Sequence, residues 1–431
     1  MLHFRVLAQR LLTRGNDYCV VTAKPLMPKH QSPSRKNALD WVGGSDAPEK
    51  SSLNIGFMAL TDSASLIVAA TQEFAQPYGL RLKLQRQASW TALSERLHSG
   101  ELDAAQGLYG LIYAMQLGLA GLPAKPMAVL MGLAQNGQSI TLSSRLQLAG
   151  VSDSEALQRQ VRQAGARLTL AHTFPTGTHA MWLYYWLASL GIHPLNDVDT
   201  LVVPPAQMVD HLQAGRIDGF CAGEPWGAQA VAQRQGFTLC TSQQLWPDHP
   251  EKVLACTREF VETCPNAARA LVMAVLEASR FLDANEENRR AAASLLSADE
   301  YLAAPVADIL PRFLGAYTDG NGHAWRDNHR LQFCSEGAVN MPFLSDGMWF
   351  LTQFRRWGLL REDPDYAGLT SAVQQTALYA EAASQLGLAV PAFMRSSTLF
   401  DGTQWDGHDP AGYAHSFALH AMTDSRSLAS C

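Results

Sequence analysis

Two stretches of the sequence follow one scheme, and this echo limits the fold more than any other feature. They are LSERLHSGELDAAQG, residues 93–107, and MVDHLQAGRIDGFCAG, residues 208–223. Each is typical of an amphipathic helix, then a glycine, Gly100 or Gly215, and then a short strand. Glycine suits the position after a helix where the backbone must turn sharply. The echo favours two α/β halves built alike, although helix, glycine and strand also follow one another in single α/β domains.

The order of elements before the first echo predicts a parallel sheet. SLNIGFMAL is typical of a buried strand, DSASLIVAATQEFAQPYG of a helix with Asp62 near its N-cap, and LRLKLQRQ of an alternating strand. A strand, a helix and a second strand in this order make parallel neighbours. Ligand-binding groups are expected at the carboxyl ends of such strands.

Strand-like runs at 127–143 and 253–260 are candidates for crossovers between the two halves. We expect one lobe to comprise residues 52–135 and 253–431, and the other residues 136–252. Residues 1–51 lack periodicity and are rich in Lys, Arg, Ser, Pro and Gly, which predicts a flexible or loosely docked extension. Helices are expected at 263–283, 286–296, 299–316 and 349–360.

Composition excludes several classes of protein. The 431 residues carry a net charge of −6 and no run of Lys and Arg, which argues against a nucleic-acid surface. The longest apolar stretches contain polar residues and fall short of the ~20 apolar residues that cross a bilayer. Neither nucleic acid nor a membrane is therefore an expected direct partner.

The start of the chain and its cysteines predict a cytoplasmic location. Arg5, Arg10 and Arg14 interrupt the apolar run that a secretory signal requires. The seven cysteines are irregularly spaced and form no CxxC motif, as expected of free thiols in a reducing compartment. His172, His249 and His323 have no partner at metal-ligand spacing, so no metal or other cofactor is expected.

The stretch HTFPTGTHAMWLYYWLASLGI, residues 172–192, predicts a loop that leads into an apolar helix. Thr176 or Thr178 is the expected N-cap. The first turn of such a helix presents free N–H groups and the positive end of the helix dipole, which suit a small anion. An ordinary buried helix with a core or surface His179 is the alternative for this stretch alone.

Eight motifs in order resemble one family over about residues 52–408, the nitrate/bicarbonate branch of the periplasmic substrate-binding proteins. They are LNIGFMALTDSASLIVA, QASW, LDAAQG, AQNGQSITLS, THAMWLYYWLA, DGFCAGEPW, HPEKVLACTREF and LSDGMWFLTQFRRWG. The resemblance implies a two-lobed α/β fold of the periplasmic-binding-protein type (type II), with two crossovers and a ligand cleft between the lobes. Because no export signal is recognised, the chain resembles most the cytoplasmic nitrate/nitrite sensors of the NasS type.

The resemblance also implies a set of ligand-binding residues. Trp90, Gln138, His179 and Lys252 match side chains that contact the ligand in the family, and the backbone near Gln106 and Gly107 matches contacting amides. Taken alone, a tryptophan before a helix is more often a packing residue, and a lysine more often a surface residue. Only their joint match to the family order favours binding. Glu224 is assigned a structural role.

These residue types suit nitrate or nitrite, which accept hydrogen bonds and donate none. Lys252 offers a positive charge, His179 and Gln138 offer N–H donors, and Trp90 an indole N–H or a flat face. Bicarbonate also carries a hydroxyl donor and needs an acceptor. Because the matched positions hold donors and no carboxylate, we expect nitrate or nitrite.

The sequence is compatible with three functions. The first is a nitrate/nitrite sensor that controls an RNA-binding antiterminator of the NasT type and so regulates nitrate assimilation genes. The second is the substrate-binding component of a nitrate ABC importer. An enzyme is the third, since pyrimidine-synthesising proteins share the fold. It is disfavoured because no adjacent cysteines, Ser-His-Asp set or paired carboxylates stand out in the sequence.

Overall fold

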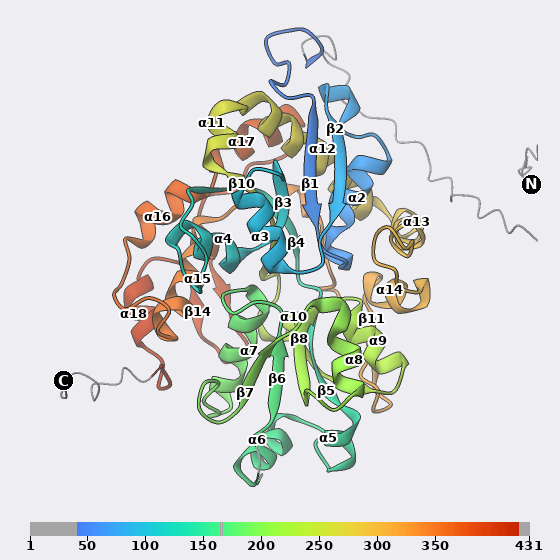
Figure 1. The fold of residues 1–431 in the computed structure, drawn as a ribbon, viewed down its shortest axis with the longest axis vertical. Helices are drawn as coiled ribbons and strands as arrows, with labels where there is room; N and C mark the ends of the chain where they lie inside the picture. The colour runs from blue at the N-terminus through green and yellow to red at the C-terminus, as the bar shows by residue number, and fades with distance from the viewer. Residues whose placement is uncertain (1–40, 164, 166, 422–431) are drawn as a thin grey trace, which may run out of the picture.

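The computed structural model describes residues 41–163, 165 and 167–421, which are organised around two sheets of five strands each. The first sheet has the order β2 (Arg81–Arg86), β1 (Ser52–Phe57), β3 (Ala104–Leu108), β10 (Pro250–Thr257) and β4 (Met127–Gln135). The second has the order β7 (Asp199–Val202), β6 (Thr169–His172), β8 (Gly219–Gly223), β5 (Gln138–Ser143) and β9 (Gly236–Thr241). We call the parts built on them lobe 1, at the top of Figure 1, and lobe 2, at the bottom. The expected two-lobed α/β fold is confirmed.

The sequence echo corresponds to equivalent places in the two sheets. In lobe 1, α3 (Trp90–His98) leads through Gly100 to β3, and in lobe 2, α8 (Met208–Gln213) leads through Gly215 to β8. Both strands lie third in their sheets. The two glycines have φ values of 80° and 68°, a region that residues with a Cβ rarely adopt. The parallel pairing of β1 with β2 was also predicted correctly.

The outgoing crossover is a tight turn at Asn136 and Gly137, which separate β4 from β5. Both residues have positive φ, 64° and 86°. A Cβ on Gly137 would lie 2.7 Å from Leu331 Cδ1, so glycine is required there on two grounds. The chain returns through α10 (Ser242–Leu245) and joins the sheet of lobe 1 from Pro250 onward. The lobe boundaries drawn from the sequence remain a prediction.

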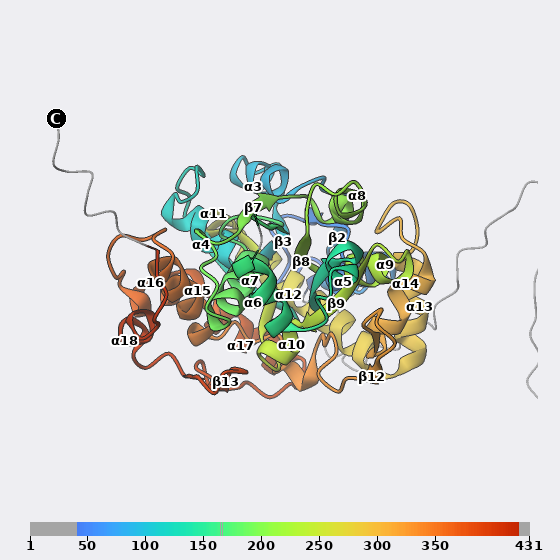
Figure 2. The same cartoon turned by 90° about the horizontal axis from the view of Figure 1, so that it is seen from below.

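Helices cover both sheets. Those of lobe 2 are α5 (Ser144–Leu148), α6 (Ser154–Gln163), α7 (Thr178–Ser189), α8 and α9 (Trp226–Ala232), followed by α10. Those that follow the return crossover are α11 (Arg258–Thr263), α12 (Pro265–Ala284), α13 (Glu286–Leu296), α14 (Val306–Phe313), α15 (Leu344–Arg356), α16 (Tyr366–Val373), α17 (Thr376–Gln385) and α18 (Pro410–His415). With α2 (Ala64–Thr71), α3 and α4 (Tyr109–Leu117) they complete the molecule. Helix α15 reaches α7 of lobe 2, as Figure 2 shows from below.

The helix expected over residues 299–316 is shorter than predicted. Helix α14 begins only at Val306, with Pro305 as its N-cap at φ −58° and ψ 141°. Proline disfavours helical backbone in the residue before it, so residues 299–305 stay irregular.

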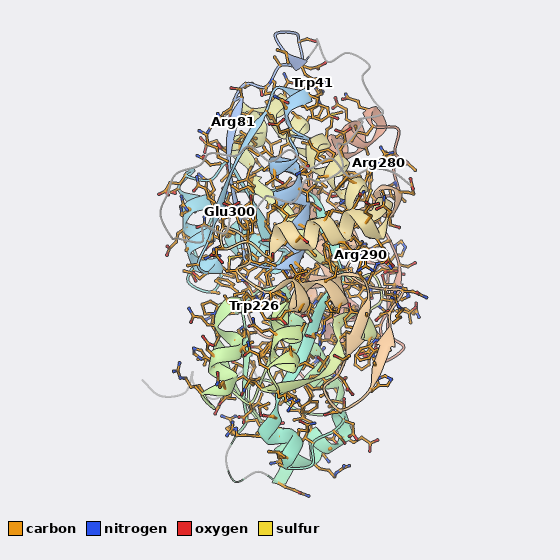
Figure 3. All side chains as sticks on the ribbon, turned by 90° about the vertical axis from the view of Figure 1, so that its right-hand side faces the viewer. Trp41, Arg81, Trp226, Arg280, Arg290 and Glu300 are labelled. Atoms are coloured by element: carbon orange, nitrogen blue, oxygen red, sulfur yellow. The ribbon has the colours of Figure 1, made fainter. Side chains whose placement is uncertain are left out.

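The predicted N-terminal extension lies mostly outside the described residues, which begin at 41. The part that is described is docked on lobe 1. Trp41, near the top of Figure 3, packs edge-on against Tyr78 at 5.4 Å between ring centroids. The Glu49 carboxylate accepts hydrogen bonds from the backbone N–H groups of Asn266 and Ala267 in the first turn of α12. Residues 41–51 therefore fix the end of a long helix of lobe 1.

Candidate ligand-binding site

Lys252 lies at the centre of a buried charged cluster between the lobes. Its Nζ is 2.9 Å from Asp62 Oδ2 and also pairs with Glu251 Oε1. Asp62 belongs to the single turn η1 (Thr61–Ser63) after β1. All three side chains are at most 1% exposed. The carboxyl end of β1 thus supplies a site residue, as the parallel sheet predicted.

A bulge in β10 brings two neighbouring residues to the same site. Adjacent side chains on a regular strand point to opposite faces of the sheet. The register of β10 against β4 shifts on both sides of Lys252, and such irregularities re-aim side chains. The Glu251 carboxylate and the Lys252 ammonium therefore meet, although they are consecutive in the sequence.

His179 approaches this cluster from lobe 2. Its Nδ1 is hydrogen-bonded to Thr173 Oγ1, and its Nε2 lies 3.7 Å from Glu251 Oε1 without a hydrogen bond. Burial and the charge of Lys252 hold the pKa of His179 well below its usual range. The ring is therefore neutral at pH 7. In the tautomer in which the Thr173 hydroxyl donates to Nδ1, the ring carries its proton on Nε2.

Gly223 shows how closely the lobes meet around the cluster. A Cβ on this residue of β8 would lie 3.2 Å from Asp62 Oδ2 and 3.8 Å from His179 Nε2. Gln138, the first residue of β5, pairs with Gly223 across the sheet. Both side-chain amide atoms of Gln138 are buried without a hydrogen-bond partner among the described residues. The expected residues His179 and Gln138 are thus brought together with Lys252.

Trp90 and Gln106 flank the cluster from lobe 1 in different ways. Lys252 Nζ lies 5.9 Å from the centroid of the Trp90 ring, whose Nε1 is buried without a partner in the described structure. The Gln106 amide is fully engaged, because its Oε1 accepts from the backbone N–H of Met58 and its Nε2 donates to Asp62 Oδ1. Gln106 therefore holds Asp62 in place. The backbone of Gln106 and Gly107 pairs with β10, and its contact with a ligand remains a prediction.

Two residues of the site were missed from the sequence, Asp62 and Glu251. The prediction that the site holds donors and no carboxylate is wrong. Asp62 was interpreted as a helix cap, yet its side chain caps no helix and pairs with Lys252 instead. Glu251 carried no signal, because strand periodicity places it on the face opposite Lys252. The argument against bicarbonate from the absence of an acceptor no longer holds.

Burial dominates the electrostatics of the cluster. It raises the pKa of Glu251 to about 8, with the nearby charge of Asp62 adding to the effect and Lys252 opposing it. Burial also raises the pKa of Asp62, against the pull of Lys252. For Lys252 burial acts to lower the pKa, but the two carboxylates outweigh it and raise the pKa above its ordinary value. The lysine is therefore charged at neutral pH.

Helix α7 starts differently from the prediction. Its N-cap is Gly177, without a side-chain hydrogen bond, so neither Thr176 nor Thr178 caps it. Glycine satisfies the extended N-cap backbone, and a Cβ there would lie 2.6 Å from Leu108 Cδ1. The hydroxyl groups of both threonines are buried and unpartnered among the described residues. They add polar groups to the seam where α7 meets lobe 1.

Direct hydrogen bonds join lobe 1 to lobe 2 beside the charged cluster. The backbone N–H of Thr61 donates to the carbonyl oxygen of Glu224 at 2.8 Å, and the Thr61 hydroxyl donates to the same oxygen at 3.1 Å. The indole N–H of Trp226, labelled between the lobes in Figure 3, donates to the Ala59 carbonyl at 3.1 Å. Lobes 1 and 2 are thus in a closed arrangement around the cluster.

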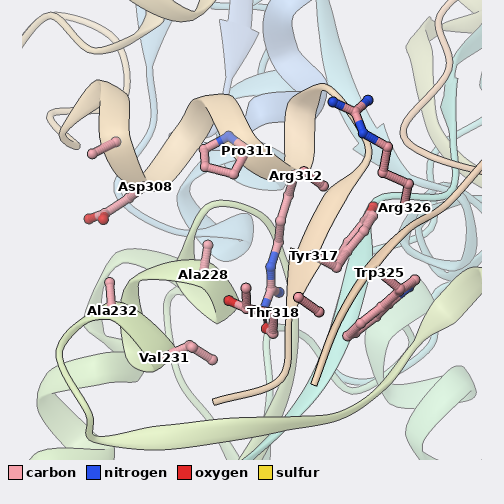
Figure 4. Close-up of a pocket in the computed structure, with 13 residues that line it drawn as sticks. Ala228, Val231, Ala232, Asp308, Pro311, Arg312, Tyr317, Thr318, Trp325 and Arg326 are labelled. Carbon is pink, nitrogen blue, oxygen red and sulfur yellow. Dashed lines mark hydrogen bonds between the residues drawn. The ribbon is translucent and has the colours of Figure 1, made fainter. Parts of the chain in front are cut away.

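Glu224 has the structural role that the sequence suggested. Its Oε2 accepts from the backbone N–H of Ala228 in α9, and its Oε1 accepts from Ser139 and from Arg312 of α14. Figure 4 shows Arg312 reaching from α14 beside a cavity of about 530 Å³ that α9 and the β11/β12 hairpin (Ala316–Thr318, Ala324–Arg326) also line. This cavity lies apart from the charged cluster, since the two share no lining residue.

In the part of the chain that the structure describes, no three or more His, Cys, Asp or Glu side chains are grouped so that they could hold a metal ion. Each helix there is too short or too polar to span a bilayer.

Comparisons with known proteins show what the whole chain is similar to. A model of the NMT1-like family matches residues 46–297. The nitrate/nitrite binding protein NrtA of Synechocystis sp. strain PCC 6803 is 37% identical over 399 residues, covering 88% of each chain. NrtA of Nostoc sp. strain PCC 7120 is 34% identical over 406 residues, covering 90% of this chain and 91% of the relative. The crystal structure of the periplasmic nitrate-binding protein NrtA from Synechocystis PCC 6803 matches with a TM-score of 0.83 at 34% identity, covering 86% of this chain and 100% of that one.

These relatives correct two expectations. The matching structure at 34% identity is that of a periplasmic protein, so the predicted cytoplasmic location is wrong. The relatives are named as nitrate-binding proteins, and the expected sensor that controls a NasT-type antiterminator is overturned in favour of the importer component weighed against it. The sequence argument failed because it depended on recognising an export signal in residues 1–40, which lie outside the described structure.

Proposed function

The chain belongs to the NMT1-like family, and from that premise we propose that it is the substrate-binding component of a nitrate ABC importer. It binds nitrate or nitrite between the two lobes and delivers the anion to a membrane-embedded permease. Its place of action is the periplasm, as for the similar NrtA. The function is binding and release, without chemical change of the anion.

One observation carries this proposal, the convergence of unpartnered buried donors on a single lysine. Trp90 and Gln138 each present an N–H group with no partner in the described structure, and His179 presents Nε2. A buried polar group without a partner costs about 1–3 kcal/mol, so three such groups beside one ammonium are expected to have a ligand. A small planar anion that accepts through three oxygens fits this set.

Isothermal titration calorimetry with nitrate, nitrite, hydrogen carbonate and chloride tests the proposal. We expect nitrate or nitrite to bind with one site per chain and chloride to bind far more weakly, because a single spherical ion cannot fill a site whose donors are spaced around a planar anion with several oxygens. Hydrogen carbonate belongs in the panel because Asp62 and Glu251 can accept its O–H. Binding of hydrogen carbonate alone would reject nitrate as the substrate, and binding of none of the oxyanions would reject the function.

The Trp90→Phe variant tests whether the indole N–H contacts the anion. Phenylalanine keeps an aromatic ring of similar shape but lacks the donor. Because a hydrogen bond to a charged group contributes about 1.5–3 kcal/mol, we expect nitrate affinity to fall roughly 10- to 100-fold. Trp357→Phe is the matched control, since Trp357 is also buried with an unpartnered Nε1 but is not part of the cluster. Equal affinities of the two variants would remove Trp90 from the ligand contacts.

A further inference from the structure

The charges of the closed site do not balance once an anion is added. Asp62 and Glu251 bring two carboxylates to one ammonium, and His179 is neutral at pH 7. If both carboxylates are ionised the cluster carries one net negative charge, and a bound nitrate makes it two. Charges that are removed from water need compensating partners. A nitrate-binding site of this composition therefore requires a further positive charge.

The hydrogen bonds distinguish the two carboxyl groups. Asp62 accepts a hydrogen bond from Gln106 Nε2 on Oδ1, and its Oδ2 forms an ion pair with Lys252 Nζ at 2.9 Å, so both of its oxygens have a contact that favours the ionised form. Glu251 receives Lys252 on Oε1 only, and its Oε2 is buried with no hydrogen-bond partner among the described residues. A proton on Oε2 gives that oxygen a hydrogen to donate and removes one negative charge.

Resting on the proposed function, we propose that nitrate occupies this site together with one proton, held by Glu251, whose neutral carboxyl group donates a hydrogen bond to the anion. The proton comes from solvent, and no covalent bond of the anion changes. Oε1 of Glu251 continues to accept from Lys252, and Oε2–H joins the donors of His179, Gln138 and Trp90. Uptake of one anion and one proton leaves the net charge of the site unchanged.

Of the titratable groups in and around the cluster, Glu251 is the one that we expect to change its protonation state in the neutral to alkaline range. Burial raises its pKa to about 8. His179 and, behind it, His172 and His249 are neutral there, because burial lowers their pKa values to about 4 for His172, about 3 for His249 and well below the usual range for His179. The other groups with raised pKa values are Asp62, whose ionised form is favoured by Lys252 and Gln106; Lys252, which stays charged; and Cys221 of β8, which stays a thiol. Nitrate itself does not titrate.

These protonation states determine how nitrate affinity changes with pH. Below about pH 8 the carboxyl group is already protonated, so nitrate affinity is constant. Above that pH the free protein loses the proton and binding must restore it, so affinity falls, approaching tenfold per pH unit.

Calorimetric titration of the full chain with nitrate between pH 6 and 9.5 tests the proposal. At pH 9, in buffers of different ionisation enthalpy, we expect roughly one proton to be taken up per nitrate. Glu251→Gln removes the titrating group and keeps a neutral donor, so its nitrate affinity should not fall between pH 8 and 9.5, whatever its value at pH 6. Glu259→Gln, an exposed glutamate, is the control and should keep the wild-type pH profile.

Failure of the proton-coupling proposal and failure of the proposed function give different results in this experiment. If the wild-type protein binds nitrate with constant affinity and no proton uptake up to pH 9.5, proton coupling is rejected and the proposed function stands. If it binds no nitrate at any pH, the proposed function falls with it. The wild-type proton count does not depend on any variant, so a Glu251→Gln chain that fails to fold leaves the test decisive.

Discussion

Lys252→Ala should weaken nitrate binding by at least about 100-fold, because truncating one partner of a buried hydrogen-bonded charge pair costs roughly 2–5 kcal/mol or more. The loss exceeds that of a single contact. Asp62 stays behind, and without the ammonium at 2.9 Å its buried carboxylate lies beside the anion with no compensating charge. Calorimetry with nitrate measures the effect.

Lys125→Ala is the matched control for this variant. Lys125 pairs with Glu259 at 3.5 Å, and the glutamate side chain is 74% exposed. Exposed pairs of this kind contribute at most about 1 kcal/mol to folding, so neither stability nor nitrate affinity should change much. Nitrate affinity within about threefold of the wild type in Lys252→Ala would contradict the site assignment.

The fold was predictable in the parts of the chain where the local sequence pattern and the order of the elements indicate the same structure. The order of strand, helix and strand from Ser52 specifies a parallel pair, and β1 and β2 form one. Gly100 and Gly215 marked two equivalent turns, because positive φ leaves few alternatives to glycine. The helix expected from 299 failed where Pro305 overrides an otherwise helical composition.

Sequence reasoning proposed donors for the candidate site and missed its carboxylates. Trp90, Gln138, His179 and Lys252 were assigned through a resemblance to a family, and the structure brings them together between the lobes. Glu251 escaped because the alternation of a regular strand places it away from Lys252, and only the bulge in β10 reverses this. A register shift depends on how β10 fits between β3 and β4, which a single sequence does not specify.

The misassigned role has a physical reason too. A sensor and a transport receptor for the same anion need the same kind of donors, so the residues proposed to contact nitrate cannot separate the two roles. They differ in which protein recognises the closed state, and this depends on surfaces of the two lobes that carry no motif. The cleft residues therefore predict a ligand class, and the expected role was corrected only by comparison with the relatives.

Gly110→Ala should weaken nitrate binding roughly 10- to 100-fold although residue 110 does not contact the ligand. Nitrate binds the closed arrangement of the lobes, so a substitution that destabilises this arrangement lowers the apparent affinity. Gly110 is the second residue of α4 in lobe 1, and a Cβ there would lie 1.9 Å from the Thr176 carbonyl oxygen of lobe 2. Since real atoms cannot approach so closely, the two lobes must separate at this point. The penalty applies only when the lobes are closed, so the melting temperature without nitrate should change much less than the affinity.

Small-angle X-ray scattering with and without nitrate detects lobe closure as a change in the shape of the molecule. The wild-type protein should become more compact when nitrate is added, and Gly110→Ala should need a much higher nitrate concentration for the same change. Gly165→Ala is the control, because a Cβ there meets nothing within 4 Å. If Gly110→Ala binds nitrate as tightly as this control, the α4/α7 contact does not belong to the closing motion. If its melting temperature without nitrate falls as steeply as its affinity, the clash is present in the open state as well.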